Sequence, residues 1–393
     1  MLYGPMDPNE RFRARRDQTR RTKRRRRAAV LAFLLLIVIA LVMGARFVGD
    51  NQAGAKPTRA TAPVAQTAVA TRPRPLPVEI RGVHVTAALA SLSGKFKEYV
   101  DYKRYGLNTI ELDVKDEAGE IGFATPNVPL ARKVGANRLF YNPKAMVALA
   151  HRNGIYMIGR VVCFQDPTLA RERPDLAIER PDGSVWTTSA GLGWVNPYDR
   201  RVWDYCASVA QAAADAGFDQ IMFDYVRFPS DGDVERAVYG SRGSLAKREA
   251  IPAFLRYANR RLDPFGVRLS AAVFGLSAAR DLGIGQIPRR MAPYLDTVYA
   301  MTYPSLFGNG ELGLQDPSRS PGATVARALR KFELALRGRR ALVVPWVQDF
   351  SFTVPYGIDE VRAQIDAARL SGAKGYMLWN AECVYTDGAL APT

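Results

Sequence analysis

The chain has only three cysteines and two histidines among its 393 residues. Cys163, Cys206 and Cys383 are too few and too scattered for a disulfide framework, and none has the close pairing of a zinc site. We expect these cysteines to be buried as small apolar side chains. His84 and His151 suggest no metal-ligand cluster, and His151, inside a helical stretch, is expected to be structural. The sequence therefore predicts no metal and no other cofactor.

Acidic residues are the minority charge: 38 Asp and Glu stand against 55 Lys and Arg, which gives a formal net charge of +17. Residues 1–27 carry eleven basic and three acidic residues, a net of +8, and residues 46–80 add a net of +3. The remaining +6 is spread over the rest of the chain. Since the basicity belongs mainly to a tail, it does not indicate a nucleic-acid groove, and no nucleic-acid partner is expected.

Charge is missing altogether from residues 28–45, an apolar run that follows the basic cluster 23–27. The length of this run is close to the minimum for a helix that crosses a bilayer core. It predicts a retained transmembrane signal anchor, with a cleaved signal peptide as the alternative. Because positive flanks stay cytoplasmic, the tail 1–27 should be inside a cell (inner) membrane and the rest periplasmic or extracellular.

Residues 46–79 show no apolar periodicity and are rich in Ala, Thr, Pro and Gln, as expected of a flexible linker. From there on, short apolar runs alternate with longer amphipathic stretches, a pattern typical of a parallel sheet whose strands are joined by helices. Eight such units fit a (β/α)₈ TIM barrel over residues 80–393. The glycine-rich loop of an open doubly wound sheet is absent after the first strand. The expected strands are 82–86, 109–114, 156–164, 220–227, 268–274, 297–303, 341–347 and 375–380. The clearest expected helices are 95–105, 143–152, 201–216, 246–261, 323–336 and 359–370.

The strongest candidate site residue is Asp224, which interrupts an apolar strand near its carboxyl end. Burying a carboxylate there is costly unless it is paired or used, and the carboxyl ends of barrel strands carry the chemistry of this fold. Arg227, three residues on, is close enough to pair with Asp224 or to bind substrate. A buried Asp–Arg pair that only fastens the barrel rim is the structural alternative.

A glycosidase usually needs a second carboxyl group. The sequence leaves Glu382, Asp349, Asp113 and Asp116 in competition for it, with Glu382 or Asp349 favoured as the acid. Strict alternation along the second strand would put Glu111, Asp113 and Lys115 on one side, with Asp116 beyond the strand end. A structural Lys–Asp network is the alternative for this strand.

Other strand ends carry side chains suited to a sugar. Aromatic rings stack on the CH groups of pyranoses, while amides, carboxylates and guanidinium groups bind hydroxyls. The expected substrate-binding residues are Asp113, Asp116, Arg160, Arg227, Tyr303, Trp346, Gln348, Trp379 and Asn380.

Six segments of the chain resemble a bacterial glycoside hydrolase family built on one conserved domain of unknown function. They are Glu111–Asp116, Trp194–Tyr198, Phe223–Pro229, Gly283–Gln286, Pro345–Phe350 and Met377–Ala381. The resemblance covers residues 81–390 and implies a glycosidase-type barrel more firmly than it implies activity. Relatives often carry Asp where Ala272 stands, so a fifth-strand carboxylate is missing here.

A more distant likeness connects the chain with chitinase-type barrels. Residues 219–229 are similar to their fourth-strand acidic motif, 301–303 to their sixth strand and 377–379 to their eighth. Their catalytic glutamate falls near Val226 or Arg227 here, which excludes that mechanism. We therefore expect a carboxylate-based hydrolase that acts on an envelope or extracellular polysaccharide. A non-catalytic glycan-binding barrel and a membrane-tethered interaction scaffold are the alternatives.

Overall fold

The computed structural model describes residues 74–240 and 245–390. The predicted tail 1–27, the apolar run 28–45 and most of the linker 46–79 lie outside these residues. Within them, no helix is both long and apolar enough to cross a membrane.

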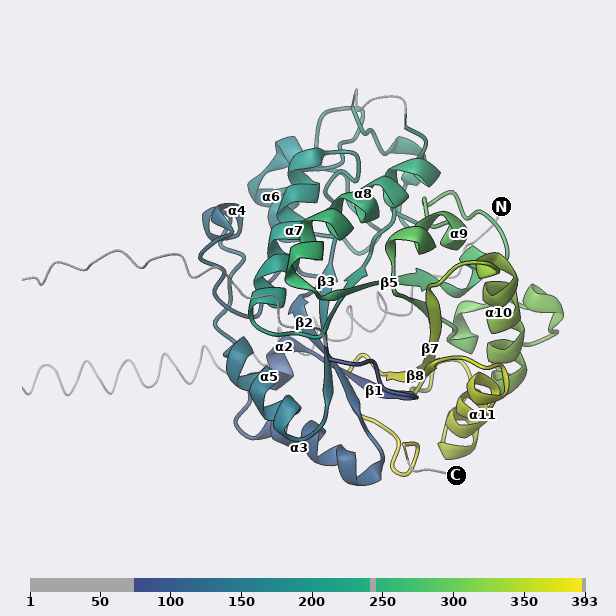
Figure 1. The fold of residues 1–393 in the computed structure, drawn as a ribbon. Helices are drawn as coiled ribbons and strands as arrows, with labels where there is room; N and C mark the ends of the chain where they lie inside the picture. Colours follow the sequence, from purple (N-terminus) through teal and green to yellow (C-terminus); the bar gives the residue numbers. More distant parts are fainter. Residues whose placement is uncertain (1–73, 241–244, 391–393) are drawn as a thin grey trace, which may run out of the picture. The chain divides into compact units, whose positions relative to one another are not determined.

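The described chain forms a closed barrel of eight parallel strands, hydrogen-bonded in chain order from β1 round to β8 and back to β1. Helices surround the strands on the outside of the barrel (Figure 1). The TIM barrel predicted from the sequence is thereby confirmed. The strands are β1 (Ile80–Val85), β2 (Thr109–Lys115), β3 (Tyr156–Val162), β4 (Gln220–Asp224), β5 (Arg268–Phe274), β6 (Thr297–Met301), β7 (Leu342–Gln348) and β8 (Gly375–Trp379).

Some of the outer helices begin at a residue whose side chain caps the first turn. Asn142 accepts a hydrogen bond from the backbone of Ala145 ahead of α5, and Asp199 does the same for Arg201 ahead of α7. The helices are α2 (Ala87–Ala90), α3 (Lys95–Asp101), α4 (Pro129–Lys133), α5 (Pro143–Arg152), α6 (Pro167–Glu172), α7 (Arg200–Asp215), α8 (Lys247–Leu262), α9 (Pro288–Met291), α10 (Pro321–Leu336) and α11 (Ile358–Leu370). The predicted helices match α5 in full and the others to within a few residues, except that the last turn of 95–105 is a 3₁₀ helix, Tyr102–Tyr105.

The apolar core has two layers, because side chains of a barrel strand alternate between the interior and the helix-facing side. The larger layer packs the strands against the surrounding helices. The smaller layer fills the barrel and consists of Ile80, Tyr156, Ile158, Met222, Ala272, Tyr299, Met301, Tyr303, Val344, Trp346, Met377 and Trp379. The three cysteines are free and buried, as the sequence predicted.

Two strands depart from the expected regularity at their carboxyl ends. The pairing of β2 with β3 shifts register between Asp113 and Lys115, so Lys115 leaves the side that Asp113 occupies. Its ammonium instead forms a buried ion pair with Asp166 at 2.9 Å. The prediction that Lys115 shares a side with Glu111 and Asp113 is wrong, because the bulge adds a residue to one strand and breaks strict alternation.

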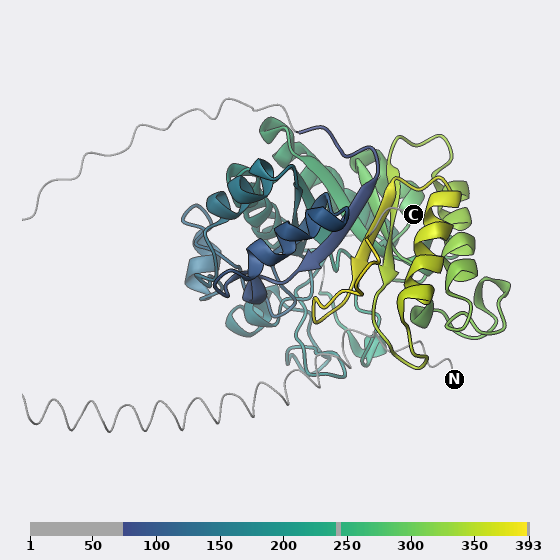
Figure 2. The same ribbon diagram turned by 90° about the horizontal axis from the view of Figure 1, so that it is seen from below.

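The fourth strand ends at Asp224 rather than at residue 227, because Tyr225 has a backbone φ of 48°. This left-handed conformation is unfavourable for a residue with a side chain, and such strain often accompanies functional sites. The Tyr225 amide donates to Asp224 Oδ1 at 2.7 Å, which fixes the turn immediately beyond the strand. Figure 2, turned by 90° from Figure 1, shows the strands of the barrel with the helices packed outside them.

Candidate active site

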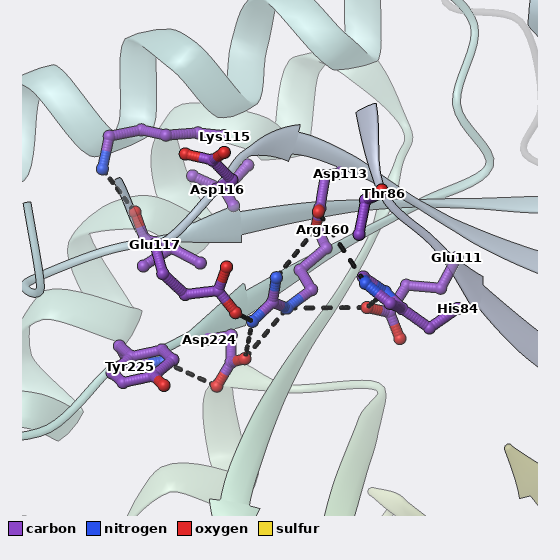
Figure 3. A network of polar contacts seen from close by, with 12 residues as sticks. His84, Thr86, Glu111, Asp113, Lys115, Asp116, Glu117, Arg160, Asp224 and Tyr225 are labelled. Atoms are coloured by element: carbon purple, nitrogen blue, oxygen red, sulfur yellow. Dashed lines mark hydrogen bonds and ion pairs between the residues drawn. The ribbon is translucent and has the colours of Figure 1, made fainter. Parts of the chain in front are cut away.

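The buried guanidinium of Arg160 on β3 binds carboxylates from three parts of the barrel (Figure 3). Its Nη1 lies 2.7 Å from Asp113 Oδ1 on β2. Its Nη2 lies 2.6 Å from Asp224 Oδ2 at the end of β4 and 2.7 Å from Glu117 Oε1 in the loop after β2. A fourth carboxylate, Glu111, lies 3.6 Å from Arg160 Nε. We call Arg160 and these four acids the Arg160 cluster.

Asp224 is held more firmly than its neighbours in this cluster. Both Nε and Nη2 of Arg160 donate to its Oδ2, at 2.9 and 2.6 Å, while the Tyr225 amide donates to Oδ1. Its residue is only 2% exposed. Hydrogen bonds from a charged donor are stronger than those between neutral groups, so these contacts fix the position of the Asp224 carboxylate.

Glu117 differs from Asp224 in exposure although both bind the same nitrogen. Its side chain is 19% exposed, whereas that of Asp224 is 2% exposed. Because Glu117 Oε1 and Asp224 Oδ2 lie 2.7 and 2.6 Å from one nitrogen, the two oxygens can be no farther apart than the sum of these distances. The cluster thus brings one enclosed and one solvent-accessible carboxylate within reach of the same small group.

His84 on β1 joins the cluster on its Glu111 side. Its Nδ1 lies 3.0 Å from Glu111 Oε1 and its Nε2 lies 3.7 Å from Asp113 Oδ2. The imidazole ring packs against Trp379, with ring centroids 4.4 Å apart. The guanidinium of Arg160 lies 5.4 Å from the same indole ring. Trp379 at the end of β8 therefore helps to orient both groups.

Burial and charge act against each other in this site. Burial would lower the pKa of His84, but Asp113 and Glu111 outweigh it and leave that pKa raised. Burial raises the pKa of Glu111 and of Asp113, and the opposing effects of His84 and Arg160 do not cancel it. His84 and its two acidic neighbours therefore hold protons more tightly than they would in water.

The same three residues also have the composition of a cation site. One ligand atom from each of His84, Glu111 and Asp113 lies within 4.8 Å of the others. The expectation that neither histidine joins such a group is therefore wrong for His84. The Arg160 guanidinium binds Asp113 and lies close to Glu111, so a cation here would meet a fixed positive charge. This geometry favours an ion-pair network over a metal centre.

The structure gives Arg227 partners other than Asp224. Its Nη1 donates to Phe228 O and to Ser230 Oγ, each at 3.1 Å. Its guanidinium lies over the rings of Trp194, Tyr225 and Phe274. The predicted pairing of Arg227 with Asp224 is wrong, because Tyr225 turns the chain away from strand geometry and Arg160 takes that place.

Asp349 and Glu382, the acids expected to complete a catalytic pair, have other hydrogen-bond partners than the Arg160 cluster. Both oxygens of Asp349 accept hydrogen bonds from Thr386, through its backbone amide and its hydroxyl. Burial raises the pKa of Asp349 although these bonds lower it. Glu382 is exposed in the chain after β8, and its amide donates to Asn380 Oδ1. Within residues 74–240 and 245–390, neither acid contributes a bond to the Arg160 cluster.

Asp116 shapes the loop after β2. Its Oδ1 accepts hydrogen bonds from the amides of Ala118 and Glu120, at 3.0 and 2.9 Å. Burial, with the nearby Glu117 and Asp113 carboxylates, raises its pKa to about 7. The turn that Asp116 closes is the one that carries Glu117 toward Arg160.

The expected amide ligands bind backbone groups in neighbouring loops. Gln348 accepts from the Ser305 amide and donates to Phe350 O, and Asn380 donates to Asp349 O. These contacts join the chain segments that follow β6, β7 and β8. Both side chains thus position the loops at this end of the barrel.

The three expected aromatic ligands stack on one another. Trp346 and Trp379 have centroids 4.6 Å apart and an interplanar angle of 9°, and Tyr303 stacks on both at 6.5 and 6.3 Å. All three are nearly fully buried. Trp346 Nε1 has no hydrogen-bond partner among the described residues, so an acceptor on a ligand would satisfy it. Through Trp379, this stack is continuous with Arg160, Asp113 and Asp224.

Sequence reasoning missed Glu117 and underestimated His84. Glu117 directly follows Asp116 in the acidic stretch that was singled out, but nothing local shows that the chain turns it back to Arg160. His84 lies opposite Glu111 in the β1–β2 pairing, a neighbour that follows only from strand register. Ala272 lies in the apolar interior cluster, so β5 offers no carboxylate at that position.

A family described as "Putative glycosyl hydrolase domain" matches residues 82–385. No protein of curated function matches the sequence. A hypothetical protein from Ruminiclostridium thermocellum is 35% identical, with 48% of this chain and 96% of that chain covered and a TM-score of 0.45.

Two further solved structures share the fold at low identity. The glycoside hydrolase domain of PgaB (BpsB) from Bordetella bronchiseptica is 14% identical and has a TM-score of 0.57, over 78% of this chain and 95% of that one. A beta-N-acetylhexosaminidase is 16% identical and has a TM-score of 0.50, over 78% of this chain and 66% of that one.

Proposed function

The chain belongs to the family described as a glycosyl hydrolase domain, and from this premise we propose that it hydrolyses glycosidic bonds at the Arg160 cluster. The observation that carries this proposal is the sharing of Arg160 Nη2 by Asp224 and Glu117. It supplies two carboxyl groups of different exposure at the end of the barrel where this fold carries out its chemistry.

Asp224 is the nucleophile in this proposal. Three hydrogen bonds, two of them from a guanidinium, fix the direction of its carboxylate. Glu117 is the general acid and base, since its partly exposed side chain can exchange protons with water. It replaces Glu382 and Asp349 as the second carboxylate.

The separation of the two acids favours retention of configuration. Carboxyl groups about 5–5.5 Å apart are typical of retaining glycosidases, whereas inverting enzymes need about 6.5–9.5 Å to admit a water molecule. Glu117 Oε1 and Asp224 Oδ2 lie 2.7 and 2.6 Å from the nitrogen they share, so their separation cannot reach the longer range. This upper bound supports a retaining mechanism over an inverting one.

The reaction then has two steps. Asp224 attacks the anomeric carbon while Glu117 gives its proton to the glycosidic oxygen, so that the leaving sugar departs as an alcohol. Water next attacks the anomeric carbon of the glycosyl ester as Glu117 takes a proton from it, which frees Asp224. Arg160 and Asp113 position the acids during both steps.

We further propose that the substrate is a polysaccharide of the envelope or the extracellular space. The support is the sequence of residues 23–45, where a basic cluster precedes an apolar run of membrane-spanning length. An anchor there would make this a single-pass protein of the inner membrane, with its barrel outside the cytoplasm.

A non-catalytic glycan-binding barrel is the second candidate. The observation in its favour is Ala272 in the barrel interior, since β5 contributes no carboxylate there. A scaffold without a glycan ligand would use the Arg160 cluster only to hold strands together. Both alternatives predict that hydrolysis is absent from the start.

A hydrolysis screen against a library of envelope and extracellular glycans separates these candidates. The wild-type chain is compared with Asp224→Asn and with Asp366→Asn, a control on α11 whose side chain is 53% exposed. We expect products from the wild type and the control but not from Asp224→Asn. Binding without products in all three proteins would favour the glycan-binding barrel.

A further inference from the structure

The amino-terminal end of the barrel, opposite the Arg160 cluster, carries a basic cavity of about 850 Å³. Residues at the starts of β5, β6 and β7 line it, together with the residue before β8. Its ionisable lining contains one carboxylate, that of Asp296, which accepts a hydrogen bond from the Leu269 amide. The cationic lining residues are Arg268, Arg339, Arg340 and Lys374.

A second hollow of about 580 Å³ continues this cavity over α8 and α9, since the two share Pro293, Tyr294 and Arg339. Its one carboxylate, Glu249, already accepts a hydrogen bond from the Ala246 amide at the start of α8. Its further cationic lining residues are Arg248, Arg256, Arg289 and Arg290. We call the two hollows together the basic face.

The positive charge of the basic face is largely uncompensated. None of its eight cationic side chains forms an ion pair with an acidic side chain among the described residues. Arg268 donates to the Arg74 carbonyl and Arg289 to the Arg337 carbonyl, which leaves their charges in place. Elsewhere on the barrel, exposed arginines such as Arg171 and Arg280 do have carboxylate partners.

The chain enters the barrel at this face. Leu76, which precedes β1, lines the basic cavity and also packs against the interior apolar cluster. Residues 46–73 separate the apolar run 28–45 from the first described residue. The end-to-end span estimated for a linker of that length is roughly 30 Å, which is enough for the basic face to reach a membrane that holds the run.

From these observations we propose that the basic face docks on the anionic phosphate headgroups of the membrane that holds the apolar run. Clustered Lys and Arg are attracted to anionic lipid surfaces over about one Debye length, while neutral lipid offers no such attraction. Docking in this way directs the carboxyl ends of the strands, with the Arg160 cluster, away from the membrane. The proposal goes beyond hydrolysis and does not require it.

Limited trypsin cleavage of the full chain in vesicles tests this docking. The Arg339–Arg340 sites lie in the basic face between α10 and β7, whereas Arg319 precedes α10 at the opposite end of the barrel. We expect cleavage at Arg339–Arg340 to fall about tenfold from neutral phosphatidylcholine vesicles to vesicles with one third phosphatidylglycerol. Cleavage at Arg319 should change less than about twofold, and about 0.5 M NaCl should restore cleavage at the basic face.

A pair of charge reversals provides the matched comparison. Arg289→Glu with Arg290→Glu alters the basic face without removing the Arg339–Arg340 sites, and should abolish the protection. Arg132→Glu with Lys133→Glu makes the same change of charge on exposed residues of α4 and should leave the protection intact. Cosedimentation with neutral vesicles separately tests the apolar run. The docking proposal would be overturned if the chain cosediments with both the neutral and the anionic vesicles and is cleaved equally at Arg339–Arg340 in both.

Discussion

Arg160 gives the candidate site its organisation at the scale of single residues. A buried guanidinium requires charged partners, because an unpaired buried charge is costly, and here the partners are acids from β2, β4 and the loop after β2. The same contacts that satisfy Arg160 bring Glu117 and Asp224 together. One side chain thus meets a structural need and supports the proposed catalytic arrangement.

The role of Glu117 predicts a particular pattern of kinetic loss. Glu117→Gln should lower the maximal rate about 10²- to 10⁴-fold on natural glycosides, because their leaving groups need a proton. For aryl glycosides with good leaving groups, the variant should form the glycosyl enzyme almost as fast as the wild type. Azide should then speed the turnover of the glycosyl enzyme that accumulates in the variant. Steady-state kinetics with both substrate types measures this.

Glu120→Gln is the matched control for Glu117. It changes a glutamate three residues further along the same loop, whose carboxylate binds Arg138 instead of Arg160. Equal losses on good and poor leaving groups, with no effect of azide, would show that Glu117 only supports the fold.

Asp116 predicts a pH-dependent difference in stability. Its pKa in the folded chain is raised to about 7, mainly by burial, from an ordinary value of 3.8. Between about pH 4 and pH 7 the unfolded chain releases this proton more readily, so the contribution of Asp116 to stability falls as the pH rises. Asp116→Asn keeps the acceptor for the turn and removes the titration.

The variant should therefore gain stability over the wild type as the pH rises from 4 to 8, by at most about 4 kcal/mol. Denaturant unfolding of both proteins at several pH values measures the gain. Parallel stability curves across this range would contradict the environment assigned to Asp116.

At the scale of elements, apolar runs predicted the barrel because its strands are buried on both faces and its helices on one. The ends of β2 and β4 were harder to predict, since the register shift beside Asp113 and the left-handed Tyr225 depend on neighbouring strands. Asp224 could be predicted as a site residue from its strand alone. Its ion-pair partner could not be predicted, because Arg160 is 64 residues away in the chain.

Closure of the barrel depends on a glycine at the start of β8. Gly375 has a φ of 124°, and a Cβ placed there would lie 2.1 Å from the carbonyl oxygen of Ile80 on β1. Gly375→Ala should cost at least about 3 kcal/mol of unfolding free energy, because backbone must move where β8 meets β1.

Gly372→Ala provides the comparison for this closure. Its φ is 69°, and an added Cβ would meet nothing within 4 Å. It should therefore cost only about 1–2 kcal/mol of backbone strain. Similar losses for the two variants in denaturant unfolding would show that the β8–β1 contact tolerates displacement.

At the scale of the whole molecule, the two ends of the barrel carry opposite chemistry. Acids bound to Arg160 occupy the carboxyl end, and uncompensated basic residues occupy the amino end, where the chain enters. The sequence shows the charge outside the tail and linker as spread along the chain, so it did not predict the basic face. Residues that are distant in the chain, such as Arg268 and Arg339, meet only in the folded barrel. This polarity supports the proposed docking of the amino end on a membrane, which would leave the proposed active site facing away from it.

The most direct measurement is the kinetics of Asp224→Asn on a substrate found with the wild-type chain. The substitution keeps the shape of the side chain and removes the charge of the proposed nucleophile. The maximal rate should fall about 10³-fold or more while the affinity for the glycan changes less than about threefold. The Asp366→Asn control should keep wild-type values for both. Wild-type hydrolysis by a folded Asp224→Asn protein would contradict the assignment of the Arg160 cluster as the active site.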